Sequence, residues 1–264
     1  MGGGWVRIMD ISVVLRRHEI AEADHRILNP FTEAGLSLLG RLCRLHPGSR
    51  LLDLACGKGE LLCTWAAEHR ITGLGVDLSE VFLSAAQARA DELGVAGTAG
   101  VAGQVRFERA DAAAFAIEPG SWDVACCIGA TWIGGGLSGT AAMLRRAVRP
   151  GGLVLIGEPY WRREPPDAAY QALPSGPEEW TTLAGTAQRL AQAGLELVEL
   201  LTADEHSWDR YEASQWWTVT AWLTANPDHP QAAEMREFLD SGRSTYLTYG
   251  HDLLGWGVFV TRAV

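Results

Sequence analysis

The chain has 264 residues, of which 47% are hydrophobic, so it can bury the core of one large domain. Its formal net charge of −10 disfavours contact with phosphate backbones, and we expect no nucleic-acid partner. We also expect no membrane partner, because no window approaches the length of a membrane span, and five cysteines without a Cys-x-x-Cys pair favour a reduced, cytoplasmic setting without a zinc or disulfide framework.

The first half of the chain predicts a helical cap followed by a parallel sheet. Residues 1–45 look mainly helical, with a break at Leu-Asn-Pro-Phe (28–31). Short apolar runs then alternate with helical patterns. Near-continuous apolar runs are typical of strands buried on both faces, so the alternation predicts a doubly wound α/β domain. The predicted strands are 50–55, 71–77, 105–111, 123–129 and 152–158.

The second half predicts the end of the core and an insertion. A helix at roughly 179–193 precedes strands at 195–203 and 255–264. The stretch of roughly fifty residues between these strands is too long for a plain connection, and it carries helical patterns. We therefore expect one structural domain with three parts. They are a cap segment (1–45), a core (46–203 and 251–264) and a helical insertion (204–250).

The stretch Leu-Leu-Asp-Leu-Ala-Cys-Gly-Lys-Gly-Glu (51–60) raises the question of what its two glycines are for. Gly57 and Gly59 follow the first predicted sheet strand, where glycine permits positive φ and lets a ligand approach bare backbone. A tight turn alone is the competing interpretation. Asp77 and Asp111 end the next two predicted strands, and ligands bind at the carboxyl edge of such sheets. Together with Asp53 they predict a nucleoside site, because acids are rarely buried without partners.

The choice of nucleoside ligand depends on two residues of the same motif. A dinucleotide fingerprint requires a third glycine where this chain has Leu62. The carboxylate of Asp53 would repel a pyrophosphate but suits a cationic amino-acid end. S-adenosylmethionine has an ammonium, a sulfonium, a ribose diol and an adenine, and it has no phosphate. The motif therefore favours S-adenosylmethionine and disfavours a nicotinamide oxidoreductase.

Residues 48–160 resemble the core of the class I S-adenosylmethionine-dependent methyltransferases. The matching stretches are LLDLACGKG, GVDLS, ERADAAAF and LRRAVRPGGLVLIGEPYW. The stretches EADHRILNPF and CIGATWIGGG resemble a subgroup of small-molecule methyltransferases, mostly of unassigned substrate. The resemblance implies a Rossmann-like, seven-stranded sheet with an antiparallel last strand. It also implies methyl transfer to a small-molecule acceptor, with S-adenosylhomocysteine as the product.

The resemblance also implies cofactor contacts by position. Gly57 and Gly59 would line the methionine end and Asp53 would lie under its ammonium group. Asp77 would hold the ribose, Leu78 would pack on the adenine, and Asp111 would hold the adenine amino edge. The full predicted cofactor-binding set is Asp53, Ala55, Gly57, Gly59, Asp77, Leu78, Asp111, Ala112, Ile128 and Gly129.

The acceptor site is less constrained, because methyl transfer is an in-line displacement that any aligned N, O or C nucleophile can perform. A general base is needed only if the nucleophile arrives protonated. The predicted acceptor-binding residues follow the fourth and fifth strands, although core packing is the competing interpretation for the tryptophans. They are Thr131, Trp132, Glu158 and Trp161, and the candidate catalytic groups are Glu158, His25 and Tyr160.

Two further expectations concern function and partners. The alternative to an enzyme is a catalytically silent S-adenosylmethionine-binding protein or partner subunit, which turnover of the cofactor would distinguish. We expect no metal, since no carboxylate cluster lies near the fourth strand and the cysteines lack ligand spacing. The protein is expected to be a monomer or a homodimer.

Overall fold

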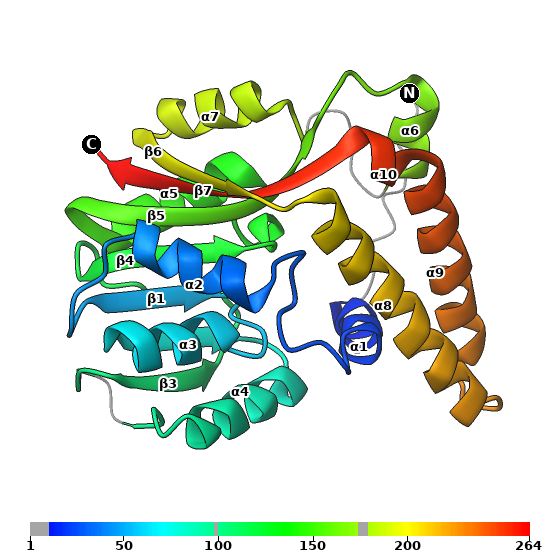
Figure 1. Ribbon diagram of the computed structural model, residues 1–264, viewed down its shortest axis with the longest axis horizontal. Coiled ribbons are helices and arrows are strands. Elements are labelled where there is room, and N and C mark those ends of the chain that lie inside the picture. The colour runs from blue at the N-terminus through cyan, green and yellow to red at the C-terminus, as the bar shows by residue number, and fades with distance from the viewer. Residues whose placement is uncertain (1–10, 98–99, 174–178) are drawn as a thin grey trace.

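The computed structural model describes residues 11–97, 100–173 and 179–264, and its centre is one seven-stranded sheet (Figure 1). The strand order is β3-β2-β1-β4-β5-β7-β6. β1 to β5 pair in parallel, whereas β7 runs antiparallel to both β5 and β6. This arrangement confirms the predicted Rossmann-like fold with an antiparallel last strand.

The strands lie close to the predicted apolar runs. They are β1 (Arg50–Leu54), β2 (Thr72–Asp77), β3 (Gln104–Arg109), β4 (Trp122–Ile128), β5 (Val148–Trp161), β6 (Leu195–Thr202) and β7 (Leu254–Ala263). One end differs from the prediction in a way that affects the site. β3 ends at Arg109, so Asp111 lies in the turn that follows and not at the strand's end. The Asp111 carboxylate accepts a hydrogen bond from the backbone of Ala113 there.

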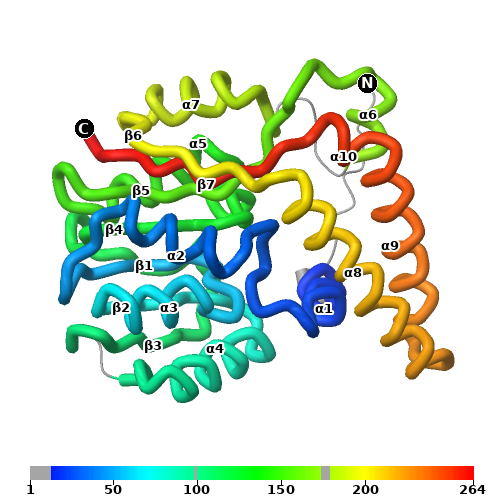
Figure 2. The backbone as a smooth tube through the Cα atoms, in the orientation of Figure 1, coloured from blue at the N-terminus to red at the C-terminus, as the bar shows by residue number. Residues whose placement is uncertain are grey.

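Helices cover both faces of the sheet (Figures 1 and 2). Residues of α2 (Glu33–Leu42), α3 (Glu60–His69) and α4 (Glu80–Glu92) pack into the core cluster of one face. Residues of α5 (Leu137–Ala147) and α7 (Leu183–Gln192) pack on the other. The turns α6 (Asp167–Ala172), η1 (Thr131–Gly134), η2 (Tyr246–Gly250) and α10 (His251–Leu253) are short.

The predicted cap and insertion pack together beside the carboxyl ends of the strands (Figure 1). α1 (Ile11–Ala21) contacts α8 (Glu205–Ala225), and α8 contacts α9 (Ala232–Thr245). These three helices share a small apolar core of their own, formed by Ile20, Ala21, Val219, Leu223, Ala232, Met235 and Leu239. The first ten residues of the predicted cap lie outside the described residues.

Candidate functional site

The two glycines of the turn between β1 and α3 are required by their backbone and by their neighbours. Gly57 has φ +53° and Gly59 has φ +67°, in the left-handed region that favours glycine. A Cβ on Gly57 would lie 2.7 Å from Leu28 Cδ1, and one on Gly59 would lie 2.6 Å from the Phe107 ring. The turn therefore brings bare backbone to the ligand edge of the sheet.

Asp77 ties this turn to the end of β2. The backbone N–H of Gly57 donates to Asp77 Oδ2 and that of Ser79 donates to Oδ1, both at 2.8 Å. Burial raises the pKa of the Asp77 carboxyl, while the two N–H groups oppose that shift. Ser79 also caps α4, as expected from its position, by accepting from the Phe82 N–H. Each Asp77 oxygen keeps lone pairs for a further donor, such as a ribose hydroxyl.

Asp53 is a buried acid without a cationic partner in the described chain. Its side chain is 4% exposed on β1. Burial raises its pKa to about 7, although the Cys126 thiol opposes the shift. A positive charge placed beside it would restore the ionised carboxylate, because opposite charges favour the charged form. The site is therefore prepared for a cationic ligand.

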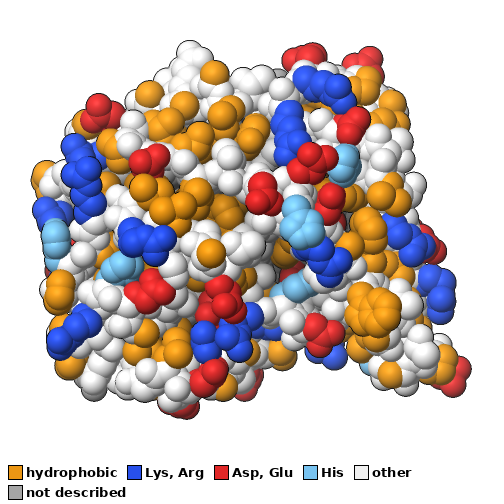
Figure 3. Space-filling model, in the orientation of Figure 1, with side chains coloured by type: hydrophobic (Ala, Val, Ile, Leu, Met, Phe, Trp, Pro, Cys, Tyr) orange, Lys and Arg blue, Asp and Glu red, His pale blue; other side chains and the backbone are white. Residues whose placement is uncertain are grey.

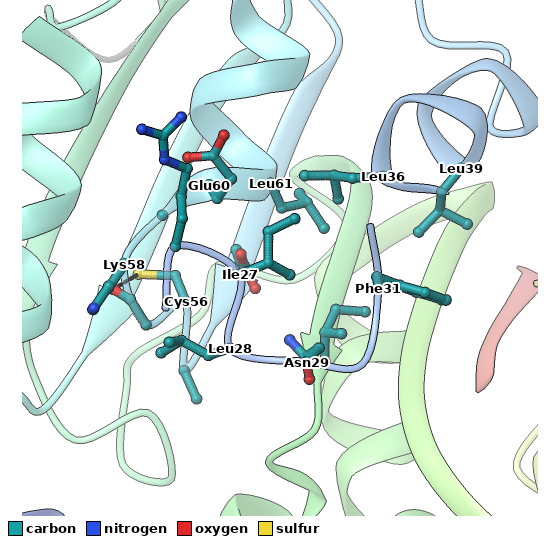
Figure 4. Close-up of a pocket in the computed structure, with 16 residues that line it drawn as sticks. Ile27, Leu28, Asn29, Phe31, Leu36, Leu39, Cys56, Lys58, Glu60 and Leu61 are labelled. Atoms are coloured by element: carbon teal, nitrogen blue, oxygen red, sulfur yellow. Dashed lines mark hydrogen bonds between the residues drawn. The ribbon is translucent and has the colours of Figure 1, made fainter. Parts of the chain in front are cut away.

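A cavity of about 70 Å³ lies between the glycine turn and the segment that follows α1 (Figure 4). Five of the ten predicted cofactor residues line it, namely Asp53, Ala55, Gly57, Gly59 and Ile128. The other five predicted residues do not. Among those five, Ala112 is buried in the core on the α5 face of the sheet, and Asp111 is exposed.

The segment 26–31 fills much of this groove. Figure 4 shows Ile27, Leu28 and Asn29 on one loop beside Cys56 and Lys58. The Leu28 side chain lies over Gly57, and the Asn29 side chain lies where a Cβ on Gly129 would be, 2.6 Å away. The sequence predicted a break in the helices here, and the structure places that break in the predicted cofactor groove.

Lys58 holds this segment closed over the turn. Its Nζ donates to the backbone carbonyls of Glu22, Ala23 and His25, at 2.7, 2.8 and 2.5 Å. These carbonyls follow the end of α1, so the lysine of the glycine motif anchors the cap. The sequence analysis did not single out Lys58. Its place between two ligand-lining glycines was the available signal.

His25 belongs to a polar cluster that joins the cap to α8. Its Nδ1 lies 2.5 Å from Glu22 Oε2, and its Nε2 lies 2.5 Å from Ser214 Oγ. The Tyr211 hydroxyl donates to Glu22 Oε1 at 2.7 Å. Both ring nitrogens of His25, a predicted catalytic group, therefore already have partners. The three contacts of this cluster span about 190 positions of sequence, which no local pattern signals.

The predicted acceptor residues after β4 and β5 fall into two groups. The Thr131 hydroxyl donates to Glu158 Oε2 at 2.7 Å, as their joint prediction requires. Glu158 is 3% exposed, its Oε1 has no hydrogen-bond partner among the described residues, and burial raises its pKa to about 7. Trp132, in contrast, is 60% exposed on η1.

Trp161 and Tyr160 end β5 on different surroundings. Trp161 is buried, and its ring packs edge-on against Tyr170 and Trp180 at centroid distances of 5.5 and 5.8 Å. This packing matches the competing interpretation of the tryptophans as core residues. Tyr160 is half-buried, and its ring covers Gly255 of β7. Neither side chain lines the cavity at the glycine turn.

Two searches of the described residues give no site of another kind. No group of three or more His, Cys, Asp or Glu side chains is placed to hold a metal ion in the described ranges. None of the helices in those ranges is long and apolar enough to cross a membrane.

Comparisons with known proteins agree with this geometry. Residues 51–152 match the family model of a methyltransferase domain. The uncharacterized protein YjhP of Escherichia coli (strain K12) is 46% identical over 246 residues, which cover 92% of this chain and 96% of YjhP.

Two crystal structures of S-adenosylmethionine-dependent methyltransferases are also similar, and both contain S-adenosyl-L-homocysteine. The protein from Geobacter sulfurreducens is 45% identical with a TM-score of 0.86, and the match covers 94% of this chain and 98% of that one. The protein from Thiobacillus denitrificans is 43% identical with the same TM-score and the same coverage of both chains.

Proposed function

This chain belongs to the class I S-adenosylmethionine-dependent methyltransferases, and from that premise we propose that it methylates a small-molecule acceptor beneath its helical cap. The observation that carries the proposal is the joined pair of Gly57 and Asp77 beside the unpaired, buried Asp53. These groups offer bare backbone, hydroxyl-accepting oxygens and a negative charge to one ligand.

The chemistry of these residues fits the cofactor. S-adenosylmethionine supplies a methyl group on a positively charged sulfur, which leaves as the neutral thioether of S-adenosylhomocysteine. In our proposal Asp53 binds the ammonium group, Asp77 accepts from the ribose hydroxyls, and the Gly57–Gly59 turn contacts the methionine end. Leu78, Ala112 and Asp111 flank the adenine. Charge-assisted hydrogen bonds of this kind contribute about 1.5–3 kcal/mol each.

The size of the cavity implies that the cap moves when the cofactor binds. Ligand pockets usually measure about 300–1,000 Å³, whereas the cavity at the glycine turn measures about 70 Å³. The Leu28 side chain takes up the space over Gly57. We propose that the segment 26–31 leaves the groove to admit the cofactor and then covers it, which would exclude water during methyl transfer.

The acceptor would lie beyond Ile128 and Gly129, between the sheet and the cap. The Glu158–Thr131 pair would position the loop that follows β4, since both side chains are buried and hydrogen-bonded to each other. Trp132, exposed on that loop, would provide apolar contact to the acceptor. An acceptor that arrives protonated would also need a proton acceptor, and Tyr160 and His25 are the candidates from the sequence.

The experiment is a turnover assay with purified protein, S-adenosylmethionine and a library of small amines, heterocycles and acids. We expect S-adenosylhomocysteine to form with at least one acceptor and not to form with the folded Asp77→Ala variant at the same cofactor concentration. Binding of the cofactor without turnover on any acceptor would contradict the acceptor class, and absence of cofactor binding would contradict the whole proposal.

A further inference from the structure

A second cavity adjoins the first on the other side of the cap segment. It measures about 280 Å³ and lies between residues 25–32 and the first turns of α8. Ile27, Asn29 and Phe31 line both cavities, so the same segment separates the two spaces. Figure 3 shows histidine and Lys or Arg side chains gathered near the middle of this face, in the region where α8 approaches the sheet. Anything bound in the second cavity is therefore one side chain away from the cofactor groove.

The α8 wall of this cavity carries unpaired positive groups. His206 and Arg210 line it, and no hydrogen bond or ion pair joins either side chain to another described residue. The nearest acids of the same helix face other partners. Glu205 and Asp209 contact His251 Nε2 at 3.0 and 3.7 Å. In a chain with a net charge of −10, a guanidinium without a carboxylate partner at a cavity is available to a ligand.

The cap wall adds a fixed, charged ring. The Ser214 hydroxyl donates to the Arg210 carbonyl at 2.6 Å, so it can only accept from His25 Nε2. The Glu22 carboxylate accepts on the Nδ1 side and also from the Tyr211 hydroxyl. Both nitrogens of His25 must then donate, as in an imidazolium whose charge Glu22 balances. The ring is held in place and leaves Arg210 as the uncompensated charge.

We propose that this second cavity binds an oxyanion of the methyl acceptor, a carboxylate or a phosphate, and that Arg210 is the residue that recognises it. This inference rests on the proposed function, since it assigns the acceptor class for the same site. The planar guanidinium matches the geometry of both oxyanions and binds them through two parallel hydrogen bonds. His206 flanks it on the same face of α8. With its anion held there, an acceptor extends its nucleophilic end past Ile27 and Asn29 toward the cofactor groove.

The test is calorimetric titration of the protein saturated with S-adenosylhomocysteine, with phenyl phosphate, benzoate and the neutral isostere benzamide as probes. We expect at least one of the two anions to bind at least tenfold more tightly than benzamide, and the tighter of the two identifies the oxyanion. Arg210→Gln should lower the affinity of that anion at least tenfold and leave benzamide unchanged.

The matched control is Arg236→Gln, which removes the same charge from an exposed position on α9 away from the cavity. It should leave every probe unaffected. Equal binding of the anions and benzamide, or an equal loss in both variants, would overturn the inference while the proposed function stands. Failure of wild-type protein to bind S-adenosylhomocysteine would instead overturn the proposed function, and this inference with it.

Discussion

The two sides of the binding region are built in different ways. The sheet side consists of the ends of β1 and β2 and the turn between β1 and α3, where Gly57, Asp77 and Asp53 lie within 25 residues of sequence. The opposite side consists of the cap segment and α8, whose contacts join residues about 190 positions apart. The first side is set by strand ends and backbone geometry, and the second depends on how two distant helices pack.

This difference separates what the fold requires from what it leaves free. Any chain that binds the same cofactor on this sheet needs an approachable turn and a hydroxyl-accepting acid, so the first side is constrained by the ligand. The second side has a core of its own and can change its lining without disturbing the sheet. We therefore expect substitutions on the sheet side to change cofactor affinity, and those on the α8 side to change acceptor choice and stability.

The largest expected effect comes from Asp77→Ala. The substitution removes the acceptor for ribose and also the two backbone hydrogen bonds that shape the turn. Because hydrogen bonds to charged groups contribute about 1.5–3 kcal/mol each, the affinity for S-adenosylmethionine should fall at least tenfold. Asp111→Ala, at an exposed turn, should have a smaller effect. Unchanged affinity in a folded Asp77→Ala variant, measured by calorimetry, would remove Asp77 from the site.

The second prediction concerns the pH dependence that Asp53 gives to the sheet side. Its pKa is raised by burial to about 7, and a cation binds the ionised form more tightly. Affinity for S-adenosylmethionine should therefore fall as the pH drops below 7, by about tenfold between pH 8 and pH 6. Calorimetry in buffers of different ionisation enthalpy should show a proton released on binding. A flat profile identical to that of Asp53→Asn would contradict this role.

The same group has the opposite effect on the unliganded protein. A carboxyl whose pKa is higher in the folded state than in the unfolded state stabilises the fold at low pH, and that stability is lost as the pH rises through about 7. Thermal denaturation should thus show wild-type protein losing more stability than Asp53→Asn between pH 5.5 and pH 8. Equal losses in the two proteins would show that Asp53 titrates normally.

A smaller effect is expected from Lys58→Met, which cuts the link between the two sides. The variant leaves three carbonyls after α1 without their donor. The segment 22–31 should open more often, so its amide hydrogens should exchange faster and cofactor dissociation should speed up several-fold. Lys58→Arg keeps a charged donor and should restore most of the protection. Unchanged exchange in Lys58→Met would show that other contacts hold the cap.

The smallest effect sharpens the comparison from the α8 side. Tyr211→Phe removes the hydroxyl that donates to the buried Glu22 carboxylate and changes nothing on the sheet. It should lower the free energy of unfolding by about 1–3 kcal/mol, because a buried acceptor loses a partner. The affinity for S-adenosylmethionine should stay within about twofold of wild type. A large loss of cofactor affinity would place α8 in the cofactor site and dissolve the distinction between the sides.

The predictability of the molecule follows the same division. The strands and the residues Asp53, Ala55, Gly57, Gly59 and Ile128 were identifiable because strand burial and the glycine turn are encoded in short stretches. The end of the third strand was placed two residues too far, since nothing local distinguishes the last paired residue from the turn.

The opposite side was only partly predictable. The insertion was predicted as helical, but its aromatic residues drew attention as a roof, whereas His206 and Arg210 line the cavity and Trp217 is exposed. The side chain of Lys58 binds backbone carbonyls more than 30 positions earlier, and a backbone acceptor leaves no mark in the sequence. Trp161 has two aromatic neighbours that only the folded chain brings together.

The most direct test of the account is a crystal structure of the protein with S-adenosylhomocysteine. The account predicts the homocysteine amino group near Asp53, the ribose hydroxyls within hydrogen-bond distance of Asp77, and the Leu28 side chain displaced from Gly57. A nucleoside bound elsewhere, with Leu28 still packed on Gly57, would contradict it.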